Sequence, residues 1–336
     1  MGWVTNYRLR LRRRRLRIRA LRKSFALKCR EDRTKRIASG DVLLFMTMRN
    51  EYVRLPYFLN YYRDLGVSHF LIVDNGSTDG GAEFLQCQKD VSLWSTKASY
   101  KQARFGMDWL TWLQMKYAHD HWCLTVDADE FFVYPFCDTR PLPALTDWLD
   151  ASAIKSFSAM ILDMYPKEAV GEETYHVGQD PFEILSWFDP GNYMQSLNPL
   201  YRNTWIQGGP RMRLFFDQKP EDAPALNKIP LVKWDRRYAY VSSTHMLLPR
   251  GLNLTYDEWG GEKASGCLLH AKFIDTFSAK AREEIERKEH FAPPDEYKTY
   301  AKSGADGPVL WCKWSEKYIN WRQLEILGLM SKGNWA

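Results

Sequence analysis

The sequence lacks any apolar run long enough to cross a membrane. No stretch of its 336 residues approaches the roughly 20 consecutive apolar residues of a spanning helix. The basic N-terminus is also not followed by the apolar segment of a secretory signal. We therefore expect a cytoplasmic protein, with any membrane contact peripheral and on the inner face.

Cysteine is scarce and irregularly spaced. The six cysteines form no CxxC pair; they stand at positions 29, 87, 123, 137, 267 and 312. This spacing predicts neither a zinc site nor a disulfide framework, and it indicates reduced thiols. Glycine is absent from "FMTMRNE" (45–51), so no glycine-rich loop follows the first apolar run to cradle phosphates. That absence disfavours a nucleotidyltransferase.

The formal net charge of +6 hides two regions of opposite sign. Residues 1–36 hold 15 Lys and Arg against two acidic residues, whereas the remaining chain has 32 basic and 39 acidic residues. Leu9, Leu16 and Ala20 would share one helical face. Residues 1–38 are thus either an amphipathic helix on anionic lipid or a solvated, disordered tail. Nucleic acid is a disfavoured partner, because no aromatic residues interleave with the arginines.

Apolar runs and helical patterns alternate from residue 41 onward. Continuous apolar runs predict buried strands, and amphipathic segments between them predict helices. The strands are expected at 42–48, 69–74, 91–96 and 122–132, and the helices at 51–66, 80–86 and 100–119. Fully apolar strands that alternate with helices predict a mostly parallel sheet with both faces covered.

The second half of the sequence has a different pattern, with long loops between its apolar runs. Further strands are predicted at 158–165, 212–216, 238–247 and 266–274, and a charged helix at 279–291. We expect one catalytic unit over 39–290, with a nucleotide-binding half (39–135) and an acceptor half (136–290). A helical extension is expected over 291–336.

The stretch "VDNGSTDG" (73–80) follows the second predicted strand and carries more polar groups than a turn needs. Glycine and Asn already supply the unusual backbone angles of a turn. Ligands of open α/β sheets bind at the carboxyl ends of the strands. We therefore take the polar side chains of this stretch as candidate ligand contacts: Asp74, Asn75, Ser77 and Asp79.

The stretch "LTVDADEFF" (124–132) places two carboxylates at the end of another predicted strand. In an extended segment Asp127 and Asp129 would point to the same side, where they need a cation or a proton. Oxygen ligands suit Mn²⁺ or Mg²⁺. The alternatives are a strand-end cap and a haloacid-dehalogenase phosphatase, but Phe131 stands where that phosphatase motif has Thr or Val.

These two stretches carry a family resemblance. The run "FMTMRNEYVRLPYFLNYYRDLGVSHFLIVDNGSTDGG" followed by "TVDADEFF" resembles the bacterial family 2-like glycosyltransferases and their relatives in family 92. The looser matches "GGPRMRLF", "NKIPLVKW", "STHMLLP" and "LLHAKFIDTFSAK" extend the resemblance over about residues 41–285. It implies a GT-A-like α/β fold: a mostly parallel sheet flanked by helices, a mixed-sheet acceptor half and a helical C-terminal tail.

The resemblance also implies roles for single residues. Asp74 would contact the base or ribose of the donor. Asp127 and Asp129 would hold the divalent ion on the donor diphosphate, with His270 approaching from the C-terminal side. The cations that could assist at phosphate are Arg49, Arg211, Arg213 and Lys228. Glu51 either joins the pocket or simply opens the following helix, where a carboxylate is favoured.

The catalytic base is less well indicated. An inverting transfer needs a carboxylate that takes the acceptor proton. Asp163, at the end of a predicted strand, and Glu258, in "YDEWGGE" with Asp257, are the candidates. A "QxxRW" run is missing, which argues against a processive synthase.

The function that we expect is a metal-dependent, inverting glycosyltransferase that uses Mn²⁺ or Mg²⁺. It would move a sugar from a nucleotide-sugar donor, UDP-sugar favoured, to a polysaccharide or lipid-linked glycan. The alternatives are a phosphatase or nucleotidyltransferase on a related sheet, and a catalytically degenerate protein that binds membrane or nucleic acid.

Overall fold

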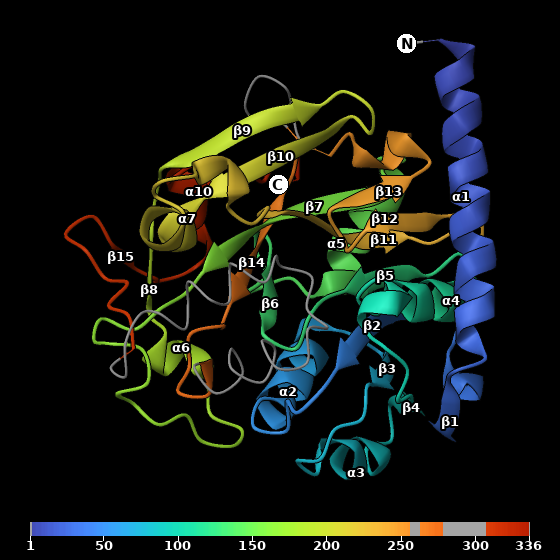
Figure 1. Ribbon diagram of the computed structural model, residues 1–336, viewed down its shortest axis with the longest axis horizontal. Coiled ribbons are helices and arrows are strands. Elements are labelled where there is room, and N and C mark those ends of the chain that lie inside the picture. Colours follow the sequence, from blue (N-terminus) through green and yellow to red (C-terminus); the bar gives the residue numbers. More distant parts are fainter. Residues whose placement is uncertain (1, 256–262, 278–306, 336) are drawn as a thin grey trace.

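The computed structural model describes residues 2–255, 263–277 and 307–335. Its centre is a nine-stranded sheet in the order β1-β4-β3-β2-β5-β11-β7-β14-β6 (Figure 1). The strands are β1 Lys28–Glu31, β4 Val91–Ser95, β3 His69–Asp74, β2 Val42–Met48, β5 Trp122–Thr125, β11 Asn227–Lys233, β7 Ser156–Asp163, β14 Gly266–His270 and β6 Glu130–Val133. The predicted α/β class with a central sheet flanked by helices is confirmed.

The sheet has a parallel half and a mixed half. Strands β4, β3, β2 and β5 are parallel neighbours. Strand β11 then runs antiparallel to both β5 and β7, β14 is parallel to β7, and β6 is antiparallel to β14. The four parallel neighbours and β6 lie within residues 39–135, whereas β11, β7 and β14 lie within residues 136–290. The division into a nucleotide-binding half and an acceptor half stays a prediction.

Alternate residues of the parallel strands pack into two different cores. Leu44 and Met46 of β2 lie in one cluster with the buried face of α2 (Leu55–Leu65). Leu43 and Phe45 lie in a second cluster, with α4 (Met107–Tyr117). Both faces of the parallel half are therefore covered, as continuous apolar strands require.

Two helices of this half, α2 and α4, are shorter than predicted. Helix α2 begins at Leu55 with Pro56 in its first turn, a position that tolerates proline, and ends at Gly66, whose φ of +102° is left-handed. Helix α3 (Gly81–Gln86) agrees with the prediction. Residues 100–106, predicted as helix, form a 3₁₀ turn and a loop that precede α4.

The basic N-terminal segment is an ordered helix packed on the body. Helix α1 (Trp3–Ser24) runs along one side of the molecule beside α4 (Figure 1). Its buried face includes Leu9, Leu16 and Ala20, so the predicted helical face is confirmed and the disordered alternative is wrong. That face packs on protein, against the hairpin of β12 (Ala239–Ser242) and β13 (Met246–Leu248), and not on lipid. The outward side of α1 carries arginines and exposed apolar side chains such as Trp3, Ile18 and Leu21, and lipid contact of this side stays a prediction.

Arg19 anchors α1 to the body. Its Nε lies 2.7 Å from Oδ2 of Asp108, a fully buried carboxylate at the start of α4. Arg104 binds the other oxygen of Asp108, also at 2.7 Å. Arg19 further donates to the backbone carbonyl of Gln102, in the loop before α4. None of the helices in the described ranges is long and apolar enough to span a membrane.

Three predicted elements differ from the structure. The predicted strand 122–132 is two strands, β5 and β6, separated by a turn, and the predicted strand 238–247 is the β12–β13 hairpin. The predicted strand 212–216 lies in helix α7 (Gly209–Phe215), because Pro210 stands in its first turn, where its fixed φ favours a helix. The predicted helix 279–291 lies outside the described residues.

Several short elements of the second half were not predicted. They are α5 Leu142–Ala151, α6 Pro181–Ile184, β8 Trp187–Phe188, β9 Tyr193–Asn198, β10 Asn203–Gly208 and β15 Glu316–Lys317. Helix α10 (Trp321–Ile326) lies in the predicted helical extension. In the described part of the C-terminal extension, α10 is the one α-helix, so residues 307–335 are less helical than predicted. This segment docks on the main core, where Phe136 packs against Trp321 and Trp335.

Candidate functional site

The loops after the parallel strands meet at one edge of the sheet. Met48, Asp74 and Ser95 are register partners at the carboxyl ends of β2, β3 and β4. Strand β5 lies beside β2, so its own carboxyl end, with the acidic turn that follows, belongs to the same edge. This is the edge where open α/β sheets bind ligands.

A pocket of about 490 Å³ opens between these loops. Its lining residues come from the ends of β2, β3 and β4: Arg49, Asn75, Gly76, Ser77, Thr78, Lys97, Ala98, Ser99 and Tyr100. Three of the predicted contacts, Arg49, Asn75 and Ser77, are among them. Residues 97–100 were missed, although the polar run "TKASY" directly after a predicted strand was a usable signal.

The carboxylates of "VDNGSTDG" hold the loops in shape. Asp74 is buried and accepts a hydrogen bond from the backbone N–H of Ser77 at 2.9 Å. Asp79 accepts from the N–H groups of Tyr52, at 2.7 Å, and Gly81, at 3.0 Å, and so ties the loop after β2 to the start of α3. Contact of Asp74 with base or ribose stays a prediction.

The other polar groups of the stretch cross-link the pocket walls. The Asn75 amide donates to the carbonyls of Thr96 and Ala98, at 3.2 and 3.0 Å. The Arg49 guanidinium donates to the carbonyls of Asn75 and Gly76, at 2.9 and 3.0 Å. Gly76 has a φ of +77°, and a Cβ there would lie 3.3 Å from Arg49. The pocket is therefore built before any ligand enters.

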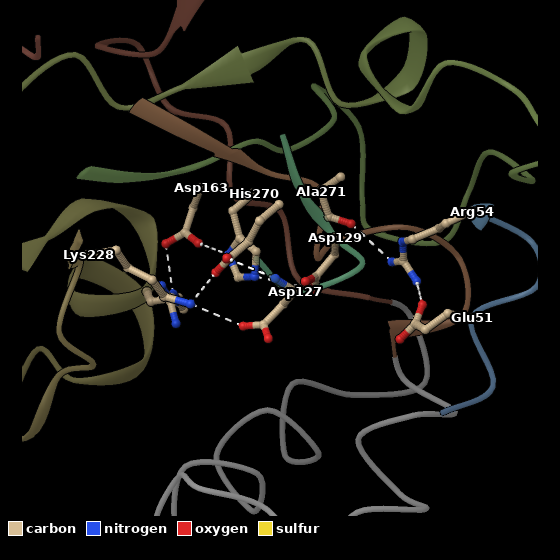
Figure 2. Close-up of polar contacts among 10 residues, drawn as sticks. Glu51, Arg54, Asp127, Asp129, Asp163, Lys228, His270 and Ala271 are labelled. Carbon is tan, nitrogen blue, oxygen red and sulfur yellow. Dashed lines mark hydrogen bonds and ion pairs between the residues drawn. The ribbon is translucent and has the colours of Figure 1, made fainter. Parts of the chain in front are cut away.

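The turn between β5 and β6, together with the first residue of β6, carries three carboxylates, and a buried lysine lies beside them. Asp127 is exposed, whereas Glu130 is buried. The Lys228 ammonium lies 3.1 Å from Oδ2 of Asp127 (Figure 2). It also lies 2.6 Å from Oε1 of Glu130. Burial raises the pKa of Glu130 to about 7, against the opposing effect of Lys228. Burial alone would lower the pKa of Lys228, but Asp127 and Glu130 raise it, so the ammonium stays charged.

A second charged network adjoins the turn. His270 and Asp163 are register partners at the ends of β14 and β7. His270 Nδ1 lies 2.7 Å from Asp163, and its Nε2 lies 3.3 Å from Asp129 (Figure 2). Burial would lower the pKa of His270, but the carboxylates of Asp129 and Asp163 raise it. An imidazolium between two carboxylates donates to both.

Asp163 has both carboxylate oxygens engaged. Arg211, on α7, approaches one oxygen at 2.7 Å while His270 approaches the other. Burial would raise the pKa of Asp163, yet these two cations lower it to about 2. A carboxylate with so low a pKa takes a proton poorly at neutral pH. The arrangement favours Asp163 as a positioning group over its predicted role as base.

The remaining predicted residues lie around this centre or outside the description. Glu51 pairs at 2.7 Å with Arg54, a buried guanidinium that also donates to the carbonyl of Ala271, just after β14 (Figure 2). Arg213, two residues after Arg211 on α7, pairs with Asp189 at 3.1 Å. Glu258 and Asp257 lie outside the described residues.

The donor groups around the acidic turn do not fit the expected divalent ion. Asp127 and Asp129 lie on a turn, so the argument from an extended segment does not hold. Asp127 and Glu130 are engaged by Lys228, and Asp129 by His270. Across the described ranges, no group of three or more His, Cys, Asp or Glu side chains is placed to hold a metal.

His245 gives this region a pH dependence. His245 is buried next to β11, the strand that carries Lys228, and its Nδ1 lies 2.6 Å from the carbonyl of Asn227. Burial, assisted by the charge of Lys228, lowers the pKa of His245 to about 4. Because the folded pKa is below the unfolded value, the stabilisation is complete above pH 6.5 and is lost as the pH falls toward 4.

We expect His245 to remove about 3 kcal/mol of the free energy of unfolding between pH 7 and pH 4. Denaturant unfolding of the wild type and of His245→Gln at both pH values measures it. Glutamine does not titrate, so the variant should lose less stability over the same interval. An equal loss in both proteins would contradict the assignment.

Comparisons with known proteins identify no family for this chain. No family model and no curated protein matches the sequence. A protein assigned as a glucose-1-phosphate thymidylyltransferase from Bacillus anthracis, in complex with a sucrose, is 7% identical, with 86% of this chain and 95% of that chain covered and a TM-score of 0.30. The mannosyltransferase PcManGT from Pyrobaculum calidifontis, in complex with GDP-Man and Mn²⁺, is 11% identical, with 89% and 80% covered and a TM-score of 0.30. Likeness at this level carries no argument, so the function must be argued from the site itself.

Proposed function

We propose that this protein is a glycosyltransferase that takes its sugar from a nucleoside diphosphate donor. The observation that carries the proposal is the preformed pocket at the carboxyl ends of β2, β3 and β4, beside the charged turn at the end of β5. Arg49 and Lys97 give the pocket positive charge, and Tyr100 offers an aromatic ring to a base. A UDP-sugar is the donor we favour.

The reaction needs charge balance on one side of the sugar and a proton acceptor on the other. As the glycosidic bond to the donor breaks, negative charge develops on the leaving diphosphate, and cations fixed in place stabilise it. The pocket binds the nucleotide so that its diphosphate faces the turn of Asp127. The proton of the acceptor hydroxyl passes to a carboxylate if the transfer inverts the anomeric centre. Glu258 remains the candidate for this base, and a polysaccharide or lipid-linked glycan remains the expected acceptor.

Binding of nucleoside diphosphates to purified protein tests the proposal. Lys97 follows β4 at the pocket edge, whereas Lys89 precedes the same strand at the opposite edge of the sheet, and both are exposed. We expect Lys97→Glu to weaken UDP binding by about tenfold or more, because a carboxylate replaces a cation in the lining of the pocket that is proposed to hold the anionic nucleotide. Isothermal titration calorimetry measures the affinity.

Lys89→Glu is the matched control and should bind as the wild type does. GDP and dTDP titrations identify the nucleotide if UDP is the wrong one. Folded protein that binds none of the three would overturn the proposal, and release of phosphate from a generic phosphoester would favour a phosphatase.

A further inference from the structure

Lys228 reaches the acidic turn because of strand register. In the antiparallel pair of β11 and β5, Leu231 is the partner of Leu124 and Lys233 is the partner of Trp122. Extending this register beyond the end of β5 places Lys228 opposite Asp127. The pairing of β11 with β7 is irregular between Lys228 and Leu231, where Pro230 offers no N–H to the ladder. The position of Lys228 in β11 therefore brings its side chain to the turn.

The Lys228 side chain is buried and forms two ion pairs. Only 5% of its side chain is exposed, and its ammonium contacts both Asp127 and Glu130. A buried ammonium without partners is strongly unfavourable, so a divalent ion that took these carboxylates would leave Lys228 without its counter-charges. An ion at the turn would also lie close to an ammonium of the same sign. The Lys228 ammonium and a divalent ion would therefore compete for the same carboxylates.

Side chains of the protein itself already supply positive charge at the turn. The carboxylates of Asp127, Asp129 and Glu130 face the Lys228 ammonium and the His270 ring. An ammonium has three N–H donors, and the two contacts with carboxylates use two of them. The third can meet a phosphate oxygen when the exposed Asp127 side chain turns aside.

We propose that the Lys228 ammonium takes the place of a divalent cation at this turn and binds the donor diphosphate directly, without a metal. The proposal rests on the function proposed above and names the group that meets the diphosphate. It replaces the expectation of a Mn²⁺ or Mg²⁺ cofactor. The lysine is a fixed positive charge, so nucleotide affinity should not depend on added metal.

Two measurements on the full-length protein test this inference. The first is UDP binding by calorimetry in Mn²⁺ and in EDTA. We expect the wild-type affinities to agree within about threefold. Lys228→Gln should lose tenfold or more in EDTA, whereas Lys228→Arg, which keeps the charge, should lose less. Asp127→Asn should bind UDP more tightly in EDTA, because Lys228 loses a competing carboxylate.

The second measurement needs no nucleotide. Electron paramagnetic resonance of Mn²⁺ titrated with protein should show no tight site in the wild type and a new site in Lys228→Gln. The double variant Lys228→Gln, Asp127→Asn should lose the new site. Circular dichroism checks that each variant is folded, and Asp127→Asn alters only an exposed side chain, so it stays informative if Lys228→Gln does not fold.

The outcomes separate the two proposals. A tight Mn²⁺ site in the wild type that Asp127→Asn removes, with UDP binding only in Mn²⁺, overturns the lysine proposal and leaves the proposed function standing. Absence of nucleotide binding in both conditions overturns the proposed function. A Lys228→Gln variant that gains no Mn²⁺ site also counts against the lysine as the occupant of the ion's place.

Discussion

Replacing Asp163 with alanine is expected to remove about 3–5 kcal/mol from the free energy of unfolding. The carboxylate is buried between Arg211 and His270, and the two cations are themselves buried. Removing the shared anion leaves two positive charges together in a region with little water. Loss of one partner from a buried ion pair costs far more than loss of a pair on the surface. Urea unfolding followed by tryptophan fluorescence measures the difference.

Glu325→Ala provides the contrast, because Glu325 pairs only loosely with the half-exposed Lys332, at 3.7 Å. We expect that variant to lose less than about 1 kcal/mol. A similarly small loss for Asp163→Ala would show that the network is hydrated in solution.

Asp163→Ala also reports on function, since a general base and a positioning group differ in the pH profile of the transfer rate. Loss of a positioning group lowers the rate without removing the acidic limb of the profile.

Asp108→Ala is expected to cost a similar amount, about 3–5 kcal/mol, and to release α1 from the body. Asp108 is fully buried and receives two guanidinium groups, from Arg19 and Arg104. Without it, α1 keeps its apolar contact through Leu9, Leu16 and Ala20 and a few exposed polar contacts, such as the hydrogen bond that Arg250 donates to Asn6. Thermal unfolding measures the stability.

Limited digestion with trypsin reports on the docking of α1, because this helix is rich in arginine and should be cleaved much faster once it detaches. Asp147→Ala, on the exposed side of α5, is the matched control and should leave both readouts unchanged. Wild-type digestion kinetics in Asp108→Ala would contradict the anchoring role of this carboxylate.

The parallel half of the fold could be predicted because its information is local. Val42–Met48 and His69–Asp74 agree with the predicted strands residue for residue, since each is an uninterrupted apolar run followed by a polar turn. The break between β5 and β6 was missed, because the turn is only four residues long and two of its residues, Val126 and Ala128, are apolar. The helix α7 was missed because "MRLFF" suits a helix or a strand equally well, and Pro210 was not used to decide between them.

The site was predictable in its residues and less so in its contacts. Asp127, Asp129, His270 and Lys228 were all singled out, and the structure brings them together. The contact of Lys228 with Asp127 joins positions 101 residues apart and depends on the register of two strands, which no local pattern reveals. For the same reason, the low pKa of Asp163 could not be foreseen, because Arg211 reaches it from a helix that was predicted as a strand.

Arg19 has a consequence beyond anchoring. The same guanidinium that binds Asp108 also holds the carbonyl of Gln102, two residues from Tyr100 in the pocket wall. Arg19 therefore links the N-terminal helix to the backbone of the segment that lines the pocket, and any coupling between α1 docking and ligand binding through this contact has the same free energy in both directions. Such coupling would appear as a change in the tryptic cleavage rate of α1 when a ligand occupies the pocket.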